Sequence, residues 1–417
     1  MKSALPYLVA LVLIAAAGYW LVDPAPPKRI VLSVSKTDAN FQAFAQLYKT
    51  LLKGDGIDLE IRESEGPRDS LEQLRRNDAR VDMAFLEDGI ASSESNVGVV
   101  SLGSLYYEPI WIFCRGRQRV SHLSALMGKR IAVGHAGSGT NILSHMLLNA
   151  ADVTAQNSQL LEIGEEEAEE ALRRGKVDAI FVSGLPTTPL IQELAASPNV
   201  TMADLDEAEA FSRQFNFLHH LVLPEGALNL KANVPSHEVN LLVPTVTLVT
   251  RESMHPALVY LVLKVISRAH SGAGMLQREH EFPSDKDTDF ELSSQAKKFY
   301  ESGPPFFDRY LPFWAATFVN RVLIILIPLA ALVVPITRIA PAIYVWLIKS
   351  RVYKLYGELR FLEMQLHNAR QPLELPEFRK ELDAIEYRVN HLHVPIAFSR
   401  HLYELRSHIA LVRTRLQ

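Results

Sequence analysis

The chain has 417 residues, a formal net charge of −4, 22% charged residues and 48% hydrophobic residues. That length suits two or three domains. The hydrophobic fraction excludes a disordered chain, and the net charge gives no sign of a nucleic-acid-binding protein. The single cysteine, Cys114, excludes a disulfide framework and a cysteine-based metal site.

The N-terminal segment is the first candidate membrane element. Residues 5–22 are apolar and follow Lys2, and residues 15–17 are three alanines. The run is just long enough to span a bilayer, and the small residues offer a signal-peptide cleavage site. The sequence therefore predicts an uncleaved anchor, with a cleaved signal peptide as the alternative, and a linker up to residue 27. In both cases the residues that follow lie outside the cytoplasm.

Strands and amphipathic helices alternate along the next part of the chain. The sequence predicts strands at 30–34, 59–62, 81–86, 97–102 and 109–114, and helices at 41–52 and 70–76. Alternating strands and helices indicate a mostly parallel sheet.

The same alternation returns in the middle of the chain. Strands are predicted at 131–133, 159–163 and 177–182, and helices at 141–150 and 165–174. The segments VDMAFL (81–86) and VDAIFV (177–182) resemble each other, which predicts two similar α/β lobes.

A late apolar run completes this pattern. Residues 241–250 read as a strand and 255–269 as a helix, and we expect 109–114 and 241–250 to be the two crossings between the lobes. Lobe 1 would then comprise 28–115 and 241–310, the latter including the approach to the membrane, and lobe 2 would comprise 116–240. A cleft between two such lobes is a usual place for a small ligand.

The C-terminal part begins with a second membrane candidate. Residues 322–337 are apolar, 339–348 extend the run, and Lys349, Arg351 and Lys354 follow it. By the positive-inside rule this predicts a transmembrane segment within 318–348 and a cytoplasmic helical tail at 349–417. A buried soluble helix is the alternative, which the length and the flanking charges disfavour. Within the tail, helices are predicted at 351–370, 376–392 and 396–416.

The glycine turn after strand 131–133 is the leading candidate site. A strand, a tight turn and a helix start leave backbone N–H groups free for a carboxylate or phosphate, and the residues placed there are Gly137, Ser138, Gly139 and Thr140. The alternative is an ordinary turn in which a hydroxyl group caps the helix. The turn lacks the lysine of a Walker loop and the full glycine set of a dinucleotide fingerprint, so a nucleotide is disfavoured.

Other candidate contacts lie in loops expected to face the same cleft. They are His135 in the glycine turn, Ser35 and Asn40 after the first strand, Tyr106 before a crossing strand, and Ser183, Gly184, Pro186 and Thr187 after the strand at 177–182. For these the alternatives are a surface histidine, core packing of the tyrosine ring and a plain turn. Glu87 and Asp88 are interpreted as a helix-capping pair.

Catalytic and metal-binding patterns are missing from the sequence. His219 and His220 lack a carboxylate at metal-ligand spacing, and neither G-x-S-x-G nor H-E-x-x-H occurs. We therefore predict no catalytic residue, no metal and no cofactor.

Four stretches, in this order, carry a family resemblance: VDMAFLEDGIA, LGSLYYEPIWIFCR, HLSALMGKRIAVGHAGSGTNILSHMLLNAADV and EEALRRGKVDAIFVSGLPTTPLI. Together they resemble the TAXI family, the extracytoplasmic solute receptors of tripartite ATP-independent periplasmic (TRAP) transporters, over roughly residues 30–269. The turn AVGxxGSGT with the preceding LxGKR is the most specific part. The resemblance implies the two-lobe periplasmic binding protein fold of type II, closing on a small solute that usually bears a carboxylate.

One departure from that family concerns the first loop. Family members usually carry a glycine-rich segment there, whereas residues 35–41 read SKTDANF, without glycine and with a negative charge at Asp38.

We expect a receptor anchored in the inner membrane, with its binding domain outside and its tail in the cytoplasm. It would capture a small anionic solute, an organic acid or amino acid, for a TRAP-type permease. The alternative is a sensor that relays ligand binding to its cytoplasmic helices.

Overall fold

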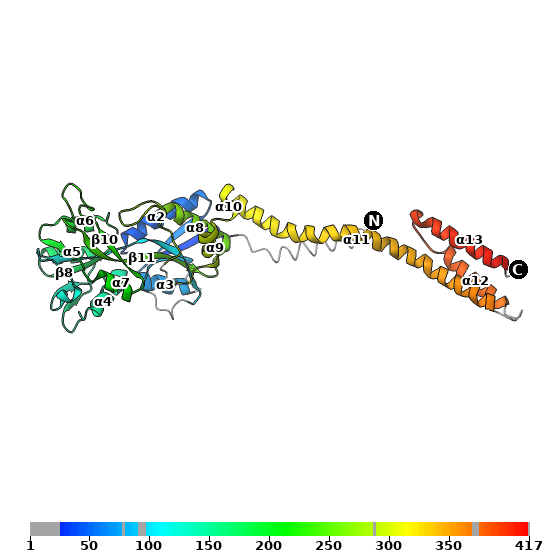
Figure 1. The fold of residues 1–417 in the computed structure, drawn as a ribbon, viewed down its shortest axis with the longest axis horizontal. Helices are drawn as coiled ribbons and strands as arrows, with labels where there is room; N and C mark the ends of the chain where they lie inside the picture. The colour runs from blue at the N-terminus through cyan, green and yellow to red at the C-terminus, as the bar shows by residue number, and fades with distance from the viewer. Residues whose placement is uncertain (1–25, 77–79, 91–96, 287–288, 369–374, 416–417) are drawn as a thin grey trace. The chain divides into compact units, whose positions relative to one another are not determined.

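The computed structural model describes residues 26–76, 80–90, 97–286, 289–368 and 375–415 (Figure 1). The chain forms two compact units, which divide between Asn320 and Arg321. The predicted anchor or signal peptide at 5–22 lies outside the described residues.

The first lobe of the larger unit is a sheet covered by helices on both faces. Its strand order is β2 (Asp58–Ser64), β1 (Arg29–Ser35), β3 (Met83–Glu87), β11 (Val239–Arg251) and β4 (Val99–Tyr107). The strand β1 runs parallel to β2 and β3, and β11 runs antiparallel to β3 and β4. Helices α2 (Ala39–Gly54), α8 (Pro256–His270) and α9 (Ser294–Ser302) share one apolar core, and α3 (Pro67–Arg75) contributes to a second.

The second lobe repeats this architecture. Its strands are β7 (Gln159–Leu161), β6 (Arg130–Ala132), β8 (Ala179–Ser183) and β5 (Ile110–Arg115), with β9 (Val200–Met202) beside β5 and β10 (Leu218–Leu223) beside β11. Helices α4 (Gly139–Ala150) and α7 (Ala208–Gln214) pack into one core, and α5 (Glu165–Arg173) and α6 (Pro189–Ala196) into another. Strands buried on both faces explain the continuous apolar runs in the sequence. The predicted two-lobe α/β arrangement is confirmed. The predicted mostly parallel sheet is wrong, because β11 and β5 run antiparallel to the strands they pair with.

Strand β11 joins the lobes. Its first half, through Pro244, pairs with β10 and β5, and its second half, from Thr245, pairs with β3 and β4. The predicted crossing at 241–250 is therefore confirmed. The other predicted crossing is wrong, because β5 pairs with β8 and β9 inside lobe 2 and the chain changes lobe just before it. An apolar run shows that a strand is central in a sheet, but not which sheet it joins.

Within the described residues of the smaller unit, three helices share a core of their own. They are the part of α11 (Phe313–Asn368) beyond residue 320, α12 (Leu375–Asn390) and α13 (Ser399–Arg415), and the short α10 (Phe306–Tyr310) precedes them in the larger unit. Val352 and Leu359 of α11 pack with Ile385 of α12 and Leu405 and Ile409 of α13. The predicted helices of the tail are thus present and form a small bundle.

Helix α11 contains the predicted membrane span, 318–348, and continues without a break through its prolines. Within the part of the chain that the structure describes, no helix meets the length and hydropathy required of a membrane-crossing segment. The predicted span is therefore not confirmed.

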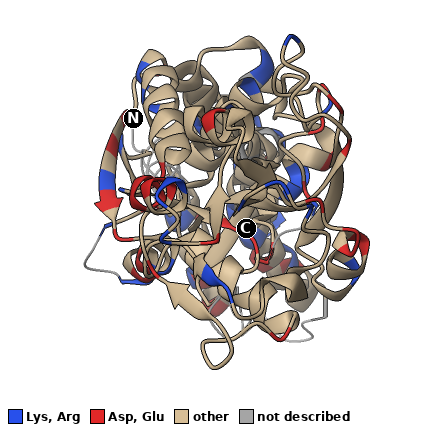
Figure 2. Ribbon diagram, turned by 90° about the vertical axis from the view of Figure 1, so that its left-hand side faces the viewer, with Lys and Arg blue, Asp and Glu red and all other residues tan. Residues whose placement is uncertain are grey.

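Positions of acidic and basic residues are interspersed along the ribbon in Figure 2. Neither sign gathers there into one large field that would steer a highly charged macromolecule. The electrostatic features that distinguish this molecule lie in its interior.

Candidate functional site

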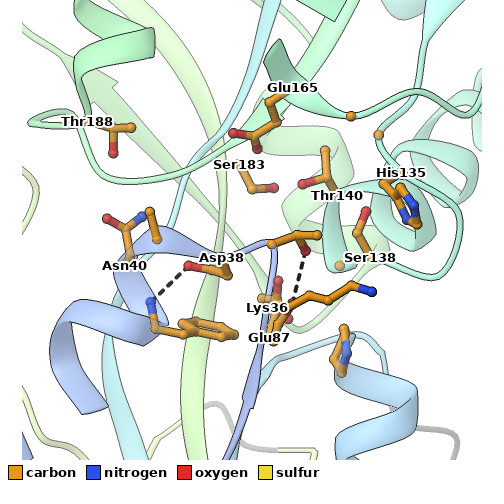
Figure 3. A pocket seen from close by; sticks show the side chains of 18 of the residues that line it. Lys36, Asp38, Asn40, Glu87, His135, Ser138, Thr140, Glu165, Ser183 and Thr188 are labelled. Atoms are coloured by element: carbon orange, nitrogen blue, oxygen red, sulfur yellow. Dashed lines mark hydrogen bonds between the residues drawn. The ribbon is translucent and has the colours of Figure 1, made fainter. Parts of the chain in front are cut away.

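A cavity of about 590 Å³ lies between the two lobes of the larger unit. Lobe 1 supplies the loop from β1 into α2 and the end of β3, and lobe 2 supplies the turn before α4, the start of α5 and the end of β8. Figure 3 shows Glu165, Ser183 and Thr140 of lobe 2 facing Asp38 and Glu87 of lobe 1. The volume falls within the usual range for small-ligand pockets, and the cavity lies at the carboxyl ends of parallel strands.

Many of the residues predicted from the sequence line this cavity. They are Ser35, Asn40, His135, Ser138, Gly139, Thr140 and Ser183. They come from three separate segments, namely the loop from β1 into α2, the turn before α4 and the end of β8. Their contact with a ligand stays a prediction.

The remaining candidates do not line the cavity. The Gly184 carbonyl accepts a hydrogen bond from Trp111 Nε1 at 2.8 Å, Pro186 is buried, and Thr187 is exposed. Gly137 has a φ of +80° and its carbonyl oxygen lies against Gly66, so its role is in the turn. Of the four residues predicted in the loop after β8, Ser183 is therefore the one that lines the cavity.

Tyr106 is a core residue rather than a wall of the pocket. Its ring is 2% exposed and packs against Phe44 and His270, with ring centroids 4.9 and 5.5 Å apart. Burial, followed by the charges of the nearby Glu108 and Asp38, raises the pKa of its hydroxyl group.

The glycine turn is only partly free to receive a ligand. Ser138 Oγ accepts from the Asn141 amide at 3.1 Å and so caps α4, and the Ser138 amide donates to the His135 carbonyl at 3.0 Å. The Gly139 and Thr140 amides have no hydrogen-bond partner among the described residues. A Cβ atom on Gly139 would lie 1.9 Å from Glu87 Oε1. The Glu87 carboxyl group thus lies beside the start of α4, close to the free amides but not hydrogen-bonded to them.

Three carboxyl groups meet at this end of the cavity. Asp38, Glu87 and Glu108 each offer an oxygen within 4.8 Å of the others. Asp38 Oδ1 accepts from the Phe41 amide at 2.9 Å and caps α2, while Glu108 Oε1 accepts from Asn40 Nδ2 at 3.1 Å. Glu87 ends β3, and Glu108 lies between β4 and β5. We call these three residues the acid cluster.

Burial raises the pKa of each member of the acid cluster. The pKa of Glu87 rises to about 8, from burial and then from the charge of Asp38. Burial raises the pKa of Asp38 to about 6 and lifts that of Glu108 well above its ordinary value. On the opposite wall, burial followed by the charge of Asp38 raises the pKa of Glu165 to about 7. These groups oppose one another's ionisation in a site shielded from water.

Several buried polar atoms around the cavity lack a partner within the described parts of the chain. They are Glu87 Oε2, Glu108 Oε2 and the Tyr106 hydroxyl in lobe 1, and Ser183 Oγ and Thr188 Oγ1 in lobe 2. Each unpartnered buried polar group costs roughly 1–3 kcal/mol, so a concentration of them indicates a place where a ligand binds.

Sequence reasoning missed the acid cluster. Glu87 was interpreted as a helix cap, and Asp38 was noted only as a negative charge. A signal was present, because VDMAFL is followed by Glu87 and the similar VDAIFV by Ser183. The two residues therefore occupy equivalent positions in the two lobes, and both line the cavity.

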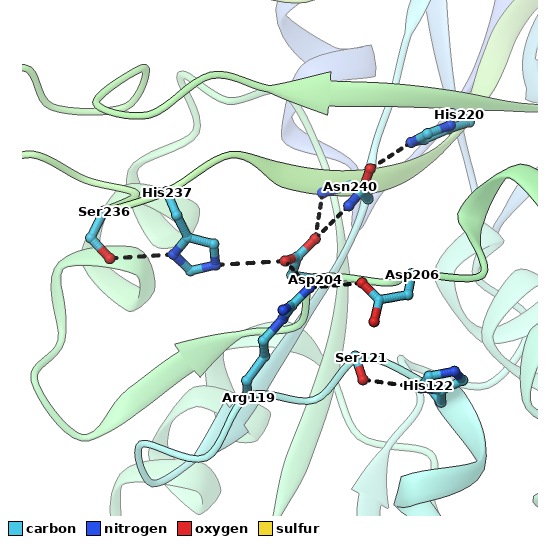
Figure 4. A network of polar contacts seen from close by, with 9 residues as sticks. All are labelled: Arg119, Ser121, His122, Asp204, Asp206, His220, Ser236, His237 and Asn240. Carbon is cyan, nitrogen blue, oxygen red and sulfur yellow. Dashed lines mark hydrogen bonds and ion pairs between the residues drawn. The ribbon is translucent and has the colours of Figure 1, made fainter.

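A second polar cluster, shown in Figure 4, serves the fold instead. Asp204 is 2% exposed, accepts from Asn240 N and Nδ2 at 2.9 and 2.7 Å, and forms an ion pair with Arg119 at 2.7 Å. His220 Nε2 lies 2.7 Å from Asn240 Oδ1. Because its partners surround Asp204, this network ties surface loops to the start of β11.

Comparisons with solved structures give weak likenesses. The alkanesulfonate-binding protein SsuA from Xanthomonas axonopodis pv. citri, bound to MOPS, is 14% identical, with a TM-score of 0.38 over 59% of this chain and 74% of that one. The aliphatic sulphonate binding protein SsuA from Escherichia coli is 16% identical, with a TM-score of 0.38 over 59% and 69%. Tv2483 bound to L-arginine is 14% identical, with a TM-score of 0.38 over 60% and 93%. At this distance, the ligands of those proteins say nothing about this chain.

The family comparison is more extensive. The model of the NMT1-like family matches residues 41–270, which include the glycine turn, the acid cluster except Asp38, and both halves of β11. The finer TAXI resemblance stays a prediction. Since the match covers more than half of the 417 residues, this chain belongs to the NMT1-like family.

Proposed function

We propose that this protein is an extracytoplasmic solute-binding receptor that captures a small metabolite between its two lobes. The observation that carries the proposal is the cavity of about 590 Å³, lined from both lobes and surrounded by unpartnered polar atoms. A ligand that contacts both walls binds the closed arrangement better than an open one, and so drives closure.

Contacts between the lobes support this mechanism. Gly66 and Gly137 meet across the cleft, as do Glu87 and Gly139, at distances that leave no room for a Cβ atom on Gly66 or Gly139. The turn before α4 therefore reaches lobe 1 directly at the rim of the cavity.

A thermal-shift screen of the purified 417-residue chain tests the proposal. The panel contains small carboxylates, amino acids, amines and sugars, and a ligand at 100 times its dissociation constant adds about 2.7 kcal/mol of stability. A Cβ atom on Gly164 meets no other atom within 4 Å at the cavity wall, so we choose Gly164→Phe to place bulk at the site. Gly272→Phe, also open but remote from the cavity lining, is the matched control. No stabilisation by any solute, or equal stabilisation of both variants, refutes the receptor function.

Anchoring in the inner membrane is the second part of the proposal. It is supported by the apolar run at 322–337, the basic residues after it, and exposed apolar side chains on α11 such as Ile324, Ile327 and Trp346. The binding lobes would lie outside the cytoplasm and the helical bundle inside, with a TRAP-type permease as partner. Carbonate extraction of membranes from the native host tests the anchoring, because a peripheral protein is released and an anchored one is retained.

A sensor is the alternative function, and one observation favours it. The three helices of the smaller unit share an apolar core, which a passive tail would not need. Deleting residues 352–417 distinguishes the two functions. Solute uptake survives the deletion if the tail is passive, whereas a ligand-dependent transcriptional or enzymatic response is lost if the tail relays binding.

A further inference from the structure

The walls of the cavity carry an excess of negative charge. Carboxyl side chains line it at Asp38 and Glu87 of lobe 1 and at residues 165–167 of lobe 2. Lys36 is the cationic side chain in the described lining, apart from the histidine of the glycine turn, and its ammonium group pairs with Glu65. The fixed positive charge is thus already neutralised by a residue outside the cavity lining.

We propose that the solute is a small organic cation carrying a primary ammonium group, bound by Asp38 and Glu87, with Glu108 completing the negative cluster. This inference rests on the proposed receptor function and names its class of ligand. It replaces the anionic solute expected from the glycine turn.

The unpartnered carboxylate oxygens point to such a ligand. Glu87 is 5% exposed, lines the cavity and leaves Oε2 without a partner, and Glu108 is 1% exposed and leaves its Oε2 likewise. In the empty site, burial favours the protonated forms of Glu87 and Glu108, and an ammonium group that enters the cluster can replace these protons as donor and as positive charge. An ammonium group supplies three N–H donors and a positive charge from one atom.

The start of α4 gives the converse argument. An anion held by the Gly139 and Thr140 amides would lie close to Glu87, whose Oε1 is 1.9 Å from the position of a Cβ atom on Gly139. Two negative groups at one helix start repel each other in a site with little water. A cation beside Glu87 relieves this repulsion.

The size of the cavity favours an organic cation over a bare metal ion. A metal ion would fill only the space among the three carboxyl groups, whereas the cavity has a volume of about 590 Å³ and reaches the opposite lobe. There Ser183 Oγ and Thr188 Oγ1 lack partners within the described chain, and Glu165 adds a second acidic wall. A carbon chain with a second polar end spans this distance and bridges the lobes.

A series of four-carbon ligands that differ only in charge tests the inference on the purified 417-residue chain. Isothermal titration calorimetry compares 1,4-diaminobutane, 4-aminobutanoate and succinate, with Ca²⁺ and Mg²⁺ as separate titrants. We expect the amines to bind and succinate not to bind. Tight binding of succinate, or binding of a metal ion alone, overturns the cationic ligand but leaves a receptor. If every solute that binds in the wider screen is neutral or anionic, the inference is likewise overturned. Binding by no solute at all overturns the receptor as well.

Variants and pH give a second readout. Glu87→Gln is expected to weaken amine binding roughly 10- to 100-fold, because it removes a charge-assisted contact. The exposed Glu63→Gln in the same lobe is the control. Affinity for the amine rises between pH 6 and pH 8, as Asp38, Glu165 and Glu87 lose their protons. An affinity that falls over this range shows that protonated carboxyl groups bind an anion, and overturns the inference.

Discussion

Replacing Glu87 by glutamine is expected to stabilise the folded lobes at neutral pH. Burial and the charge of Asp38 raise the pKa of Glu87 from 4.5 to about 8. A carboxyl group with a raised folded pKa stabilises the fold below its unfolded pKa, and this stability is lost as the pH rises through the folded pKa. At about 1.4 kcal/mol per pKa unit, the loss is about 1 kcal/mol at pH 5 and about 3 kcal/mol at pH 7. Glutamine, which stays neutral, avoids that loss.

Urea unfolding of the parent chain and Glu87→Gln at pH 5 and pH 7 measures the effect, with Trp111 as a fully buried reporter in the lobes. We expect the advantage of the variant to grow by about 2 kcal/mol between the two pH values. Glu63→Gln, an exposed change on β2, should show no such growth. An advantage of Glu87→Gln that is equal at both pH values, or absent, refutes the reasoning, because Glu87 would then ionise as an ordinary carboxyl group.

Three further predictions concern other buried positions. Gly139→Ala should displace the Glu87 carboxyl group and weaken amine binding, and the double variant with Glu87→Ala should lose less than the two single losses combined, as calorimetry measures. Burial raises the pKa of Cys114 to about 12, so its thiol should resist a disulfide reagent at pH 8 until urea unfolds the chain, and rapid labelling of the native protein would contradict this. The Tyr48 hydroxyl group lies 2.6 Å from Nε2 of His270, and burial lowers the pKa of that histidine to about 3. Tyr48→Phe removes this contact and should lower the free energy of unfolding in urea by about 1–3 kcal/mol. An unchanged free energy of unfolding would show that the fold does not need the contact.

Much of the fold follows from hydrophobic periodicity. The predicted strand at 30–34 and helix at 41–52 correspond to β1 (Arg29–Ser35) and α2 (Ala39–Gly54), and the predicted helix at 255–269 to α8. These segments bury one helical face or a whole strand, so local sequence carries the information. Helices α6 and α7 and strands β9 and β10 were not predicted. They are short or irregular, and contacts made far along the chain decide them.

The sequence predicted where the candidate site lies but not the sign of the charge on its proposed ligand. The glycine turn and the first loop line the cavity, because β-to-α turns at the carboxyl ends of strands converge whatever their side chains. The turn alone indicated an anion, since free amides favour negative charge. The opposite inference depends on Glu87, which is more than 50 residues away and reaches the same helix start only when the lobes are assembled. No short sequence pattern indicates this contact.

Pro244 gives β11 a property that ordinary strand residues lack. It is the last residue paired with β10 before Thr245 begins the pairing with β4, and its carbonyl accepts from the Glu108 amide at 3.0 Å. Because proline has no amide hydrogen, one backbone donor is missing where the strand changes partners. Bending there need not break a ladder bond from that residue. A bend at Pro244 would also shift the backbone of Glu108. The movement that opens the lobes would therefore weaken the contacts of the acid cluster with the charged end of the ligand.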